Sequence, residues 1–270
     1  MTATDKDFVG SIPEIYDTYL VPLIFEDYAR DLAQRVAAIS PSAVLETAAG
    51  SGVVARELIK VLSSSARYTV TDLNQPMLDH AASKQQEDLR LSWQQADALN
   101  LPFDNAEFDV VVCQFGVMFY PDRIKGFREA RRVLKPGGVL IFNVWDRIEN
   151  NEFADVVSAA AATVFPNDPP MFMARTPHGY YDEDLIRDEL RQAGFVNADY
   201  EALDAISSAP SARHPAIAYC QGTPLRNEIE QRDASRLEDV TDCAAAAIES
   251  RFGAGAVDAR ICGFVITATA

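Results

Sequence analysis

Positive charge is scarce in this sequence. Of its 270 residues, 24 are Lys or Arg and 40 are Asp or Glu, which gives a formal net charge of −16, and no Lys follows Lys135. A surface with this balance repels phosphate backbones and the anionic head groups of lipids. The composition therefore disfavours a nucleic-acid partner or a membrane partner, and it favours a small neutral or cationic substrate.

Cysteines and long apolar runs are also scarce. Cys113, Cys220, Cys243 and Cys262 show no metal-ligand or redox spacing, so we expect reduced thiols in the core and no metal site. No apolar run approaches the ~20 residues that span a bilayer. The N-terminal segment, MTATDKDFVGSIPEIYD, lacks the apolar core of a signal peptide. The sequence predicts a cytoplasmic protein.

What the sequence does have is an alternation of helix and strand patterns. Apolar residues recur at spacings of three and four from Phe25 to Ile39, which predicts a helix with Pro22 in its first turn. Strands that alternate with helices predict parallel βαβ units in an open sheet with both faces covered. The predicted strands are 43–46, 68–72, 91–95, 110–113 and 138–145, and the predicted helices are 52–62, 76–84 and 121–134.

The last third of the chain is less regular. Its pattern predicts helices over 151–164 and 182–193, the second closed by Gly194, and strands over 195–206 and 260–269. More than fifty mostly helical residues separate these two strands, where a hairpin normally uses 2–5 residues. We therefore expect an insertion with a function of its own.

A glycine turn follows the first predicted strand. The residues from Glu46 onward read ETAAGSG, and Gly50 and Gly52 allow a tight strand-to-helix turn with close approach of a ligand. The following helix directs its free N–H groups and its positive end at that ligand. Open α/β sheets bind ligands just outside the carboxyl ends of their strands. The turn therefore predicts a nucleotide-like ligand.

Two kinds of ligand fit this turn. Residues 50–55 (GSGVVA) match the dinucleotide fingerprint, and Asp72 stands where a ribose-binding acid is expected, which favours a nicotinamide dehydrogenase. In dehydrogenases, however, the strand runs almost up to the first glycine, whereas here it ends at Glu46, four residues earlier. A carboxylate at that place repels a pyrophosphate and attracts a sulfonium.

Five segments in order carry a resemblance to a known family. Residues 46–52 resemble the E/D-x-G-x-G-x-G loop of class I S-adenosylmethionine-dependent methyltransferases, of the ubiquinone/menaquinone C-methyltransferase-like small-molecule type. Ala48 replaces the first glycine, a mild change if its φ is negative. The other matching segments are TDLN at 71–74, QADA at 95–98, FDVVVCQFGVMFYPD at 108–122 and LKPGG at 134–138.

The resemblance implies a Rossmann-like α/β fold. This fold has a seven-stranded, mostly parallel sheet with helices on both faces, an antiparallel last strand and helical lid insertions. We expect one methyltransferase domain over 1–270, divided into an N-terminal helical cap (1–40), a cofactor-binding core (41–146) and two substrate-lid segments (147–181 and 207–259).

The resemblance also implies a cofactor, S-adenosyl-L-methionine, with S-adenosyl-L-homocysteine as product and a small molecule as acceptor. Asp72 would accept from both ribose hydroxyls and Asp97 from the adenine amine, while Tyr19 would lie on a helix that covers the methionine end. The implied cofactor-binding residues are Tyr19, Glu46, Ala48, Ala49, Gly50, Ser51, Gly52, Asp72, Leu73, Met77, Ala96, Asp97, Ala98, Gln114, Phe115 and Gly116.

The sequence identifies no catalytic residue. Alignment of the nucleophile, methyl group and sulfur can supply roughly 7–11 kcal/mol, so many such enzymes need no catalytic side chain. His178 and His214 lie in the lid segments and are candidates for substrate contact, whereas His80 is expected to be solvated or structural. The other candidates are Tyr120, Tyr180 and Tyr181.

Two alternatives stay open at this point. One is an NAD(P)-dependent oxidoreductase, and the other is a non-catalytic homologue that binds S-adenosylmethionine. The acceptor, the methylated atom and the oligomeric state are also left open.

Overall fold

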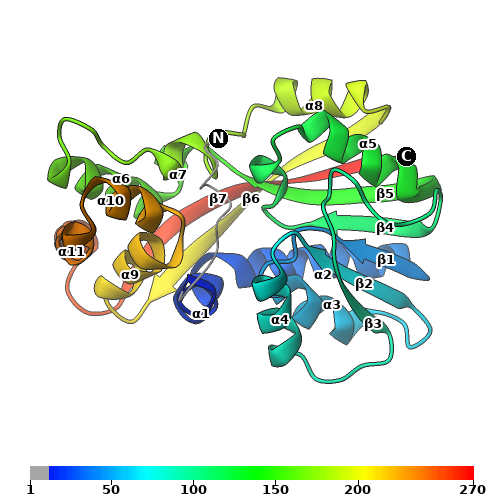
Figure 1. Cartoon of the computed structure of the whole chain (residues 1–270), viewed down its shortest axis with the longest axis horizontal. Helices are drawn as coiled ribbons and strands as arrows, with labels where there is room; N and C mark the ends of the chain where they lie inside the picture. Colours follow the sequence, from blue (N-terminus) through cyan, green and yellow to red (C-terminus); the bar gives the residue numbers. More distant parts are fainter. Residues whose placement is uncertain (1–11) are drawn as a thin grey trace. The chain divides into compact units, whose positions relative to one another are not determined.

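The computed structural model describes residues 12–270, so residues 1–11 of the predicted N-terminal cap lie outside it. Seven strands form one sheet in the order β3-β2-β1-β4-β5-β7-β6, with β7 antiparallel (Figure 1), as predicted. The pairs β1–β2, β2–β3, β1–β4 and β4–β5 are parallel. The strands are β1 (Ala43–Glu46), β2 (Arg67–Asp72), β3 (Leu91–Gln95), β4 (Phe108–Cys113), β5 (Leu134–Trp145), β6 (Asn197–Ala209) and β7 (Val257–Thr269).

The helical elements include a π-helix, η2, and three short 3₁₀ turns. The elements are α1 (Ile12–Ile15), η2 (Tyr16–Phe25), α2 (Glu26–Ile39), α3 (Val53–Val61), α4 (Gln75–Lys84), η3 (Val117–Phe119), α5 (Arg123–Val133), η4 (Ile148–Asn150), α6 (Glu152–Val164), α7 (Phe172–Arg175), α8 (Glu183–Gln192), α9 (Arg213–Gly222), α10 (Leu225–Asp233), η5 (Ala234–Arg236) and α11 (Leu237–Phe252). Among the residues described, no helix is both long enough and apolar enough to cross a membrane.

The chain divides into two compact units. The sheet unit comprises Glu26–Val144, Tyr181–Ala202 and Phe264–Ala270. The helical unit comprises the chain up to Phe25, then Trp145–Tyr180 and Leu203–Gly263.

The core of the sheet unit is built on β1 and β4. All four residues of β1 are buried, as are Val110, Val111 and Val112 of β4. Strands covered on both faces are expected to be continuous apolar runs of this kind. In this unit α2 contacts α3, and α5 contacts α8.

Asp109 of β4 fixes the amino end of β1. One of its carboxylate oxygens accepts from Ser42 N at 2.9 Å, from Ser42 Oγ at 2.7 Å and from Ala43 N at 2.8 Å. The other oxygen accepts from Lys135 Nζ at 2.6 Å. These donors outweigh the effect of burial and lower the pKa of Asp109 to about 2.

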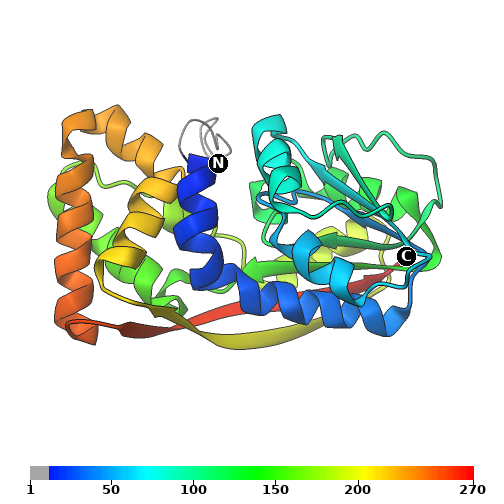
Figure 2. The ribbon, with the colours of Figure 1, turned by 90° about the horizontal axis from the view of Figure 1, so that it is seen from below.

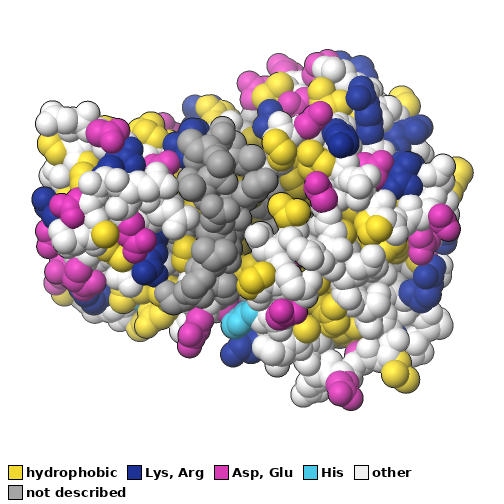
Figure 3. Space-filling view, in the orientation of Figure 1, with side chains coloured by type: hydrophobic (Ala, Val, Ile, Leu, Met, Phe, Trp, Pro, Cys, Tyr) yellow, Lys and Arg dark blue, Asp and Glu magenta, His cyan; other side chains and the backbone are white. Residues whose placement is uncertain are grey.

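Helix α8 begins and ends as the sequence predicted. The Asp182 side chain accepts from Leu185 N at 3.0 Å at its start, and Gly194 follows its end with φ of 97°. Its Glu189 carboxylate forms an ion pair with Arg123 of α5, with 2.9 Å between Oε2 and Nε. Charged side chains of both signs crowd the surface over α5 and α8 (Figure 3).

In the helical unit, α11 packs against both α9 and α6, and Figure 2 shows α9 and α11 side by side.

Glu228 of α10 holds the segment before α7 to α10. Its carboxylate accepts from Met171 N at 2.8 Å and Phe172 N at 3.2 Å, and it pairs with Arg175 at 2.7 Å. The side chain is 8% exposed. A single carboxylate on α10 therefore fixes the position of the irregular segment that precedes α7.

Several predicted boundaries were wrong. Pro22 lies inside η2 and not in a first helical turn, because the chain is already helical from Ile12. Strand β5 begins at Leu134, four residues before the predicted start, since Leu134 pairs with Phe108 and a register irregularity absorbs the residues up to Val139. Strands β6 and β7 are longer than predicted, so the insertion between them spans 210–256.

We predict that Glu228→Ala lowers the free energy of unfolding by about 2–3 kcal/mol, because it removes two buried hydrogen bonds from backbone N–H groups and the ion pair with Arg175. Chemical denaturation measures this change. Glu230→Ala is the matched control on the same helix, since Glu230 forms a partly exposed pair with Arg226, and we expect a loss below about 0.5 kcal/mol. Equal losses in the two variants would contradict the role given to Glu228.

Candidate active site

The candidate site lies at the carboxyl edge of four neighbouring strands of the sheet unit. Because β3, β2, β1 and β4 are adjacent and parallel, the residues that follow them meet at one edge. All predicted cofactor-binding residues except Tyr19 fall on this edge or on α4 beside it. Tyr19 belongs to the helical unit, where its ring lies 4.8 Å from that of His214.

The two glycines of the loop after β1 serve different purposes. Both have positive φ, 57° at Gly50 and 79° at Gly52. A Cβ added to Gly52 would come within 2.9 Å of Ala81 Cβ on α4, so close helix packing requires this glycine. Among the residues that the structure describes, a Cβ added to Gly50 would meet only the Met77 methyl, at 3.8 Å. Space is therefore open above Gly50, where a ligand can approach the backbone.

Asp72, at the end of β2, holds this loop in place. Its Oδ2 accepts from Gly50 N at 2.8 Å, and its Oδ1 accepts from Asn74 N at 2.7 Å. The side chain is 6% exposed, and this burial raises the pKa of its carboxyl despite the two N–H donors. Asp72 is thus part of the framework of the loop as well as a candidate ligand.

The sequence analysis expected the change from glycine to Ala48 to be mild if the φ of Ala48 is negative. The φ is in fact positive. Its φ is +54°, and Phe115 in the loop after β4 has a φ of +50°. A left-handed conformation costs a non-glycine residue roughly 1–2 kcal/mol. A Cβ added to Gly116 would lie 2.6 Å from Ala48 Cβ, so the methyl group of Ala48 uses the space that Gly116 leaves. Strained residues often cluster at functional sites, and these two stand in adjoining loops.

Glu46, the last residue of β1, is buried. It is 1% exposed, and it accepts a hydrogen bond from the hydroxyl of Tyr68 on β2. Burial raises the pKa of Glu46 to about 8, so its carboxyl is mostly protonated at neutral pH. The sequence argument treated Glu46 as an ionised carboxylate, whereas in this structure the group is largely neutral. Tyr68 comes close to Glu46 because it takes a diagonal position across the β1–β2 pair. Predicting this contact from the sequence would have required the register of the two strands.

The other predicted ligand residues line the same edge. Leu73 is 42% exposed, which is unusual for its type, and Met77 faces Gly50. Ala96 N donates to Asp72 O at 3.0 Å, which joins β3 to β2. Asp97 is exposed, and its Oδ1 accepts from Leu99 N at 2.9 Å in a local turn. The remaining members are Ala49, Ser51, Ala98 and Gln114. The buried Oγ of Ser51 has no hydrogen-bond partner within residues 12–270.

The histidine candidates have different surroundings. His178, in the helical unit, is 5% exposed, and its Nδ1 lies 2.9 Å from Asp146 O. Burial lowers its pKa to about 4, so the ring is neutral at pH 7. Because a carbonyl only accepts, Nδ1 carries the proton. His214 Nε2 lies 3.3 Å from Tyr19 O, and His80 lies on α4.

The tyrosine candidates are also placed differently. Tyr120 lies partly buried against the loop after β1, with its hydroxyl 3.2 Å from Thr47 Oγ1. Tyr180 is 3% exposed in the helical unit, and Tyr181 accepts at its carbonyl from Tyr200 in the sheet unit. The four cysteine thiols are free, and three of them are buried.

Comparisons with known proteins agree with this geometry. Residues 44–138 match the model of a methyltransferase-domain family. The ubiquinone/menaquinone biosynthesis C-methyltransferase of Laribacter hongkongensis is 30% identical over 173 residues, and the match covers 60% of this chain and 70% of that protein. The chain therefore belongs to the class I S-adenosylmethionine-dependent methyltransferases and is a methyltransferase, as the sequence predicted.

Two further relatives are more distant. A demethylmenaquinone methyltransferase of Clavibacter sepedonicus is 26% identical over 202 residues, which cover 67% of this chain and 79% of that one. A chain from the complex between the Haloferax volcanii Trm112 methyltransferase activator and a methyltransferase shares the fold. Its TM-score is 0.58 at 18% identity, with 98% of this chain and 99% of that chain covered.

We predict that the free energy of unfolding falls as pH rises from about 6.5 to 8. The folded carboxyl of Glu46 holds its proton up to pKa about 8, whereas the unfolded one loses it near 4.5, so the folded state binds more protons in this window. The slope for one group is at most about 1.4 kcal/mol per pH unit. His178, with its lowered pKa, adds the opposite slope only at lower pH.

Denaturant titrations at several pH values measure this slope. Glu46→Gln keeps an acceptor for Tyr68 but has no proton to lose, so its slope should be nearly flat. An unchanged slope in Glu46→Gln would show that another group carries the pH dependence.

Proposed function

We propose that the chain binds S-adenosyl-L-methionine at the candidate active site and transfers its methyl group to a small-molecule acceptor. The observation that carries this proposal is the open space above Gly50, beside an acid at the end of β2. Membership of the family implies use of this cofactor. The ligand would occupy the side of the loop that Gly50 leaves uncovered.

The residues present fit this ligand. Asp72 stands at the end of β2 beside the open side of the loop, where its carboxylate could accept from a ribose hydroxyl as well as from Gly50 N and Asn74 N. Leu73 offers an exposed apolar side chain next to it, of the kind that packs on an adenine ring. Asp97 is exposed and can accept from an exocyclic amine.

The bound cofactor would supply an electrophilic methyl group: its S–C bond breaks with the electron pair left on sulfur, while an electron pair of the acceptor forms the new bond. The protein's part is to orient the two reactants and exclude water. With Glu46 neutral, the loop adds little negative charge of its own next to the ligand.

We further propose that segments 147–181 and 207–259 select the acceptor. The net charge of −16 favours a small neutral or cationic molecule over a nucleic acid. Relatives whose names describe quinone methylation make an aromatic small molecule a natural first candidate. The test is transfer of a labelled methyl group to a panel of small molecules. Labelling of RNA or protein alone would contradict the proposal.

Ligand titrations separate this proposal from a nicotinamide enzyme. S-adenosyl-L-homocysteine at 100 times its dissociation constant should stabilise the chain by about 2.7 kcal/mol, while NADH should leave stability unchanged. Thermal unfolding with each ligand measures both effects. Stabilisation by NADH alone would overturn the proposed cofactor.

We predict that Gly50→Ala weakens binding of S-adenosyl-L-homocysteine at least tenfold, because the added methyl group enters the space proposed for the ligand. Titration calorimetry measures the affinity. The matched control is Gly137→Ala, since Gly137 also has positive φ and an open Cβ position but lies in the turn within β5. Both variants should lose about 1 kcal/mol of stability. Equal affinities in the two variants would place the ligand elsewhere.

A further inference from the structure

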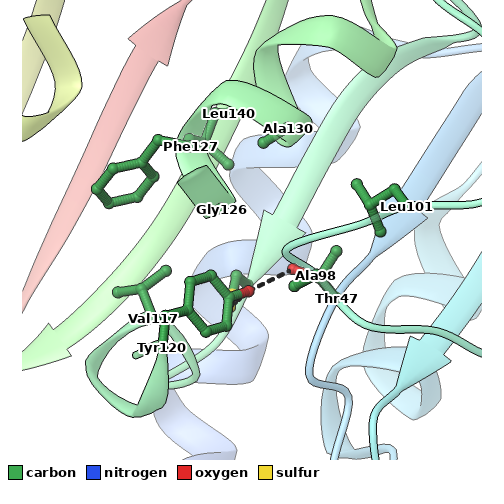
Figure 4. Close-up of a pocket in the computed structure, with 10 residues that line it drawn as sticks. Thr47, Ala98, Leu101, Val117, Tyr120, Gly126, Phe127, Ala130 and Leu140 are labelled. Carbon is green, nitrogen blue, oxygen red and sulfur yellow. Dashed lines mark hydrogen bonds between the residues drawn. The ribbon is translucent and has the colours of Figure 1, made fainter. Parts of the chain in front are cut away.

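Tyr120 joins the loops that follow β1 and β4. Its hydroxyl lies 3.2 Å from Thr47 Oγ1 and 3.5 Å from Cys113 Sγ. Thr47 is the first residue of the loop after β1, and Cys113 is the last residue of β4. Figure 4 shows the tyrosine ring extending toward Thr47. One phenol therefore reaches both strands at the candidate site.

Helix α5 is shaped to accommodate this ring. A Cβ added to Gly126 of α5 would come within 2.6 Å of Tyr120 Cδ2 and 2.8 Å of Cε2. The ring lines a small cavity of about 10 Å³, together with Phe127 and Leu140. Burial raises the pKa of Tyr120 well above 10, so the phenol keeps its proton and forms a neutral hydrogen bond.

The contact between Tyr120 and Thr47 lies at the start of the loop after β1, next to the strained residue Ala48. Thr47 N donates to Val112 O at 2.9 Å, so β4 already fixes the backbone of Thr47. The next residue, Ala48, has the strained φ, and beyond it Asp72 holds Gly50. The Gly50 end of the loop is thus held from β2, and the Thr47 end is held from β4.

We propose that Tyr120 is a positioning residue that acts through Thr47 to hold residues 47–52 in the conformation that binds the cofactor. The proposal rests on the proposed function. In this role Tyr120 makes no contact with substrate, although the sequence had made it a candidate for such contact.

The expected effect of Tyr120→Phe follows from the loss of one neutral hydrogen bond. We expect the dissociation constant of S-adenosyl-L-homocysteine to rise roughly twofold to tenfold. Thr47→Val removes the partner hydroxyl and should raise the constant by a similar factor. Thr47→Ser keeps that hydroxyl and should restore most of the affinity.

A double-mutant cycle separates positioning from a general loss of stability. If Tyr120 acts through Thr47, the double variant Tyr120→Phe/Thr47→Val should bind about as well as either single variant. Tyr200→Phe is the matched control, because Tyr200 donates its hydroxyl to Tyr181 O at 2.8 Å in the same unit. It should leave the dissociation constant unchanged.

Gly126→Ala tests the same contact without touching either hydroxyl. Its methyl group would overlap the tyrosine ring and displace it, so we expect weaker binding in the same direction as in Tyr120→Phe. Circular dichroism and thermal unfolding confirm that each variant is folded before its affinity is compared.

Three outcomes would overturn the role of Tyr120: normal binding by folded Tyr120→Phe, effects of Tyr120→Phe and Thr47→Val that multiply in the double variant, or an equal loss in Tyr200→Phe. The failure of the proposed function looks different. In that case the unaltered chain itself would not bind S-adenosyl-L-homocysteine, and the proposed cofactor site would be overturned together with the role of Tyr120.

Discussion

The candidate site depends on the hydrogen bonds that Asp72 accepts from Gly50 and Asn74. A buried carboxylate that is short of donors is costly, so the loop after β1 and the start of α4 must both bring their N–H groups to it. This requirement fixes the position of Gly50, whose open side is where a ligand can reach the backbone. A substitution of Asp72 would therefore disturb the loop and the ligand together, whereas Gly50 tests the ligand more directly.

The opposite end of the same loop carries strain. Ala48 adopts a conformation that usually requires glycine, and its methyl group is tolerated because Gly116 has no side chain to meet it. Phe115, next to Gly116, is strained as well, and its ring packs edge-on against Tyr28 of α2 at 5.0 Å between centroids. The conformation of the loop after β1 is thus determined partly by the loop after β4.

Much of the fold could be predicted from the sequence, because apolar runs such as those of β1 and β4 are bounded by glycines and acids. The glycine loop and Asp72 stood out for the same reason, since turn residues and strand-end acids are local signals. The φ of Ala48 could not be predicted, because it depends on Gly116, a residue far away in the sequence. The protonation of Glu46 depends on Tyr68 across the strand pair, and the contact of Tyr120 with Thr47 depends on how α5 packs.

Strand β1 is only four residues long, and an aspartate holds each of its ends. Asp109 binds the backbone of Ser42 and Ala43 at the amino end, and Asp72 binds Gly50 just beyond the carboxyl end. A slip of one residue would break both sets of hydrogen bonds and turn the buried side chains of β1 to the wrong faces. The strain at Ala48 therefore cannot be relieved by sliding the strand, because hydrogen bonds to Asp109 and Asp72 fix the chain on both sides of it.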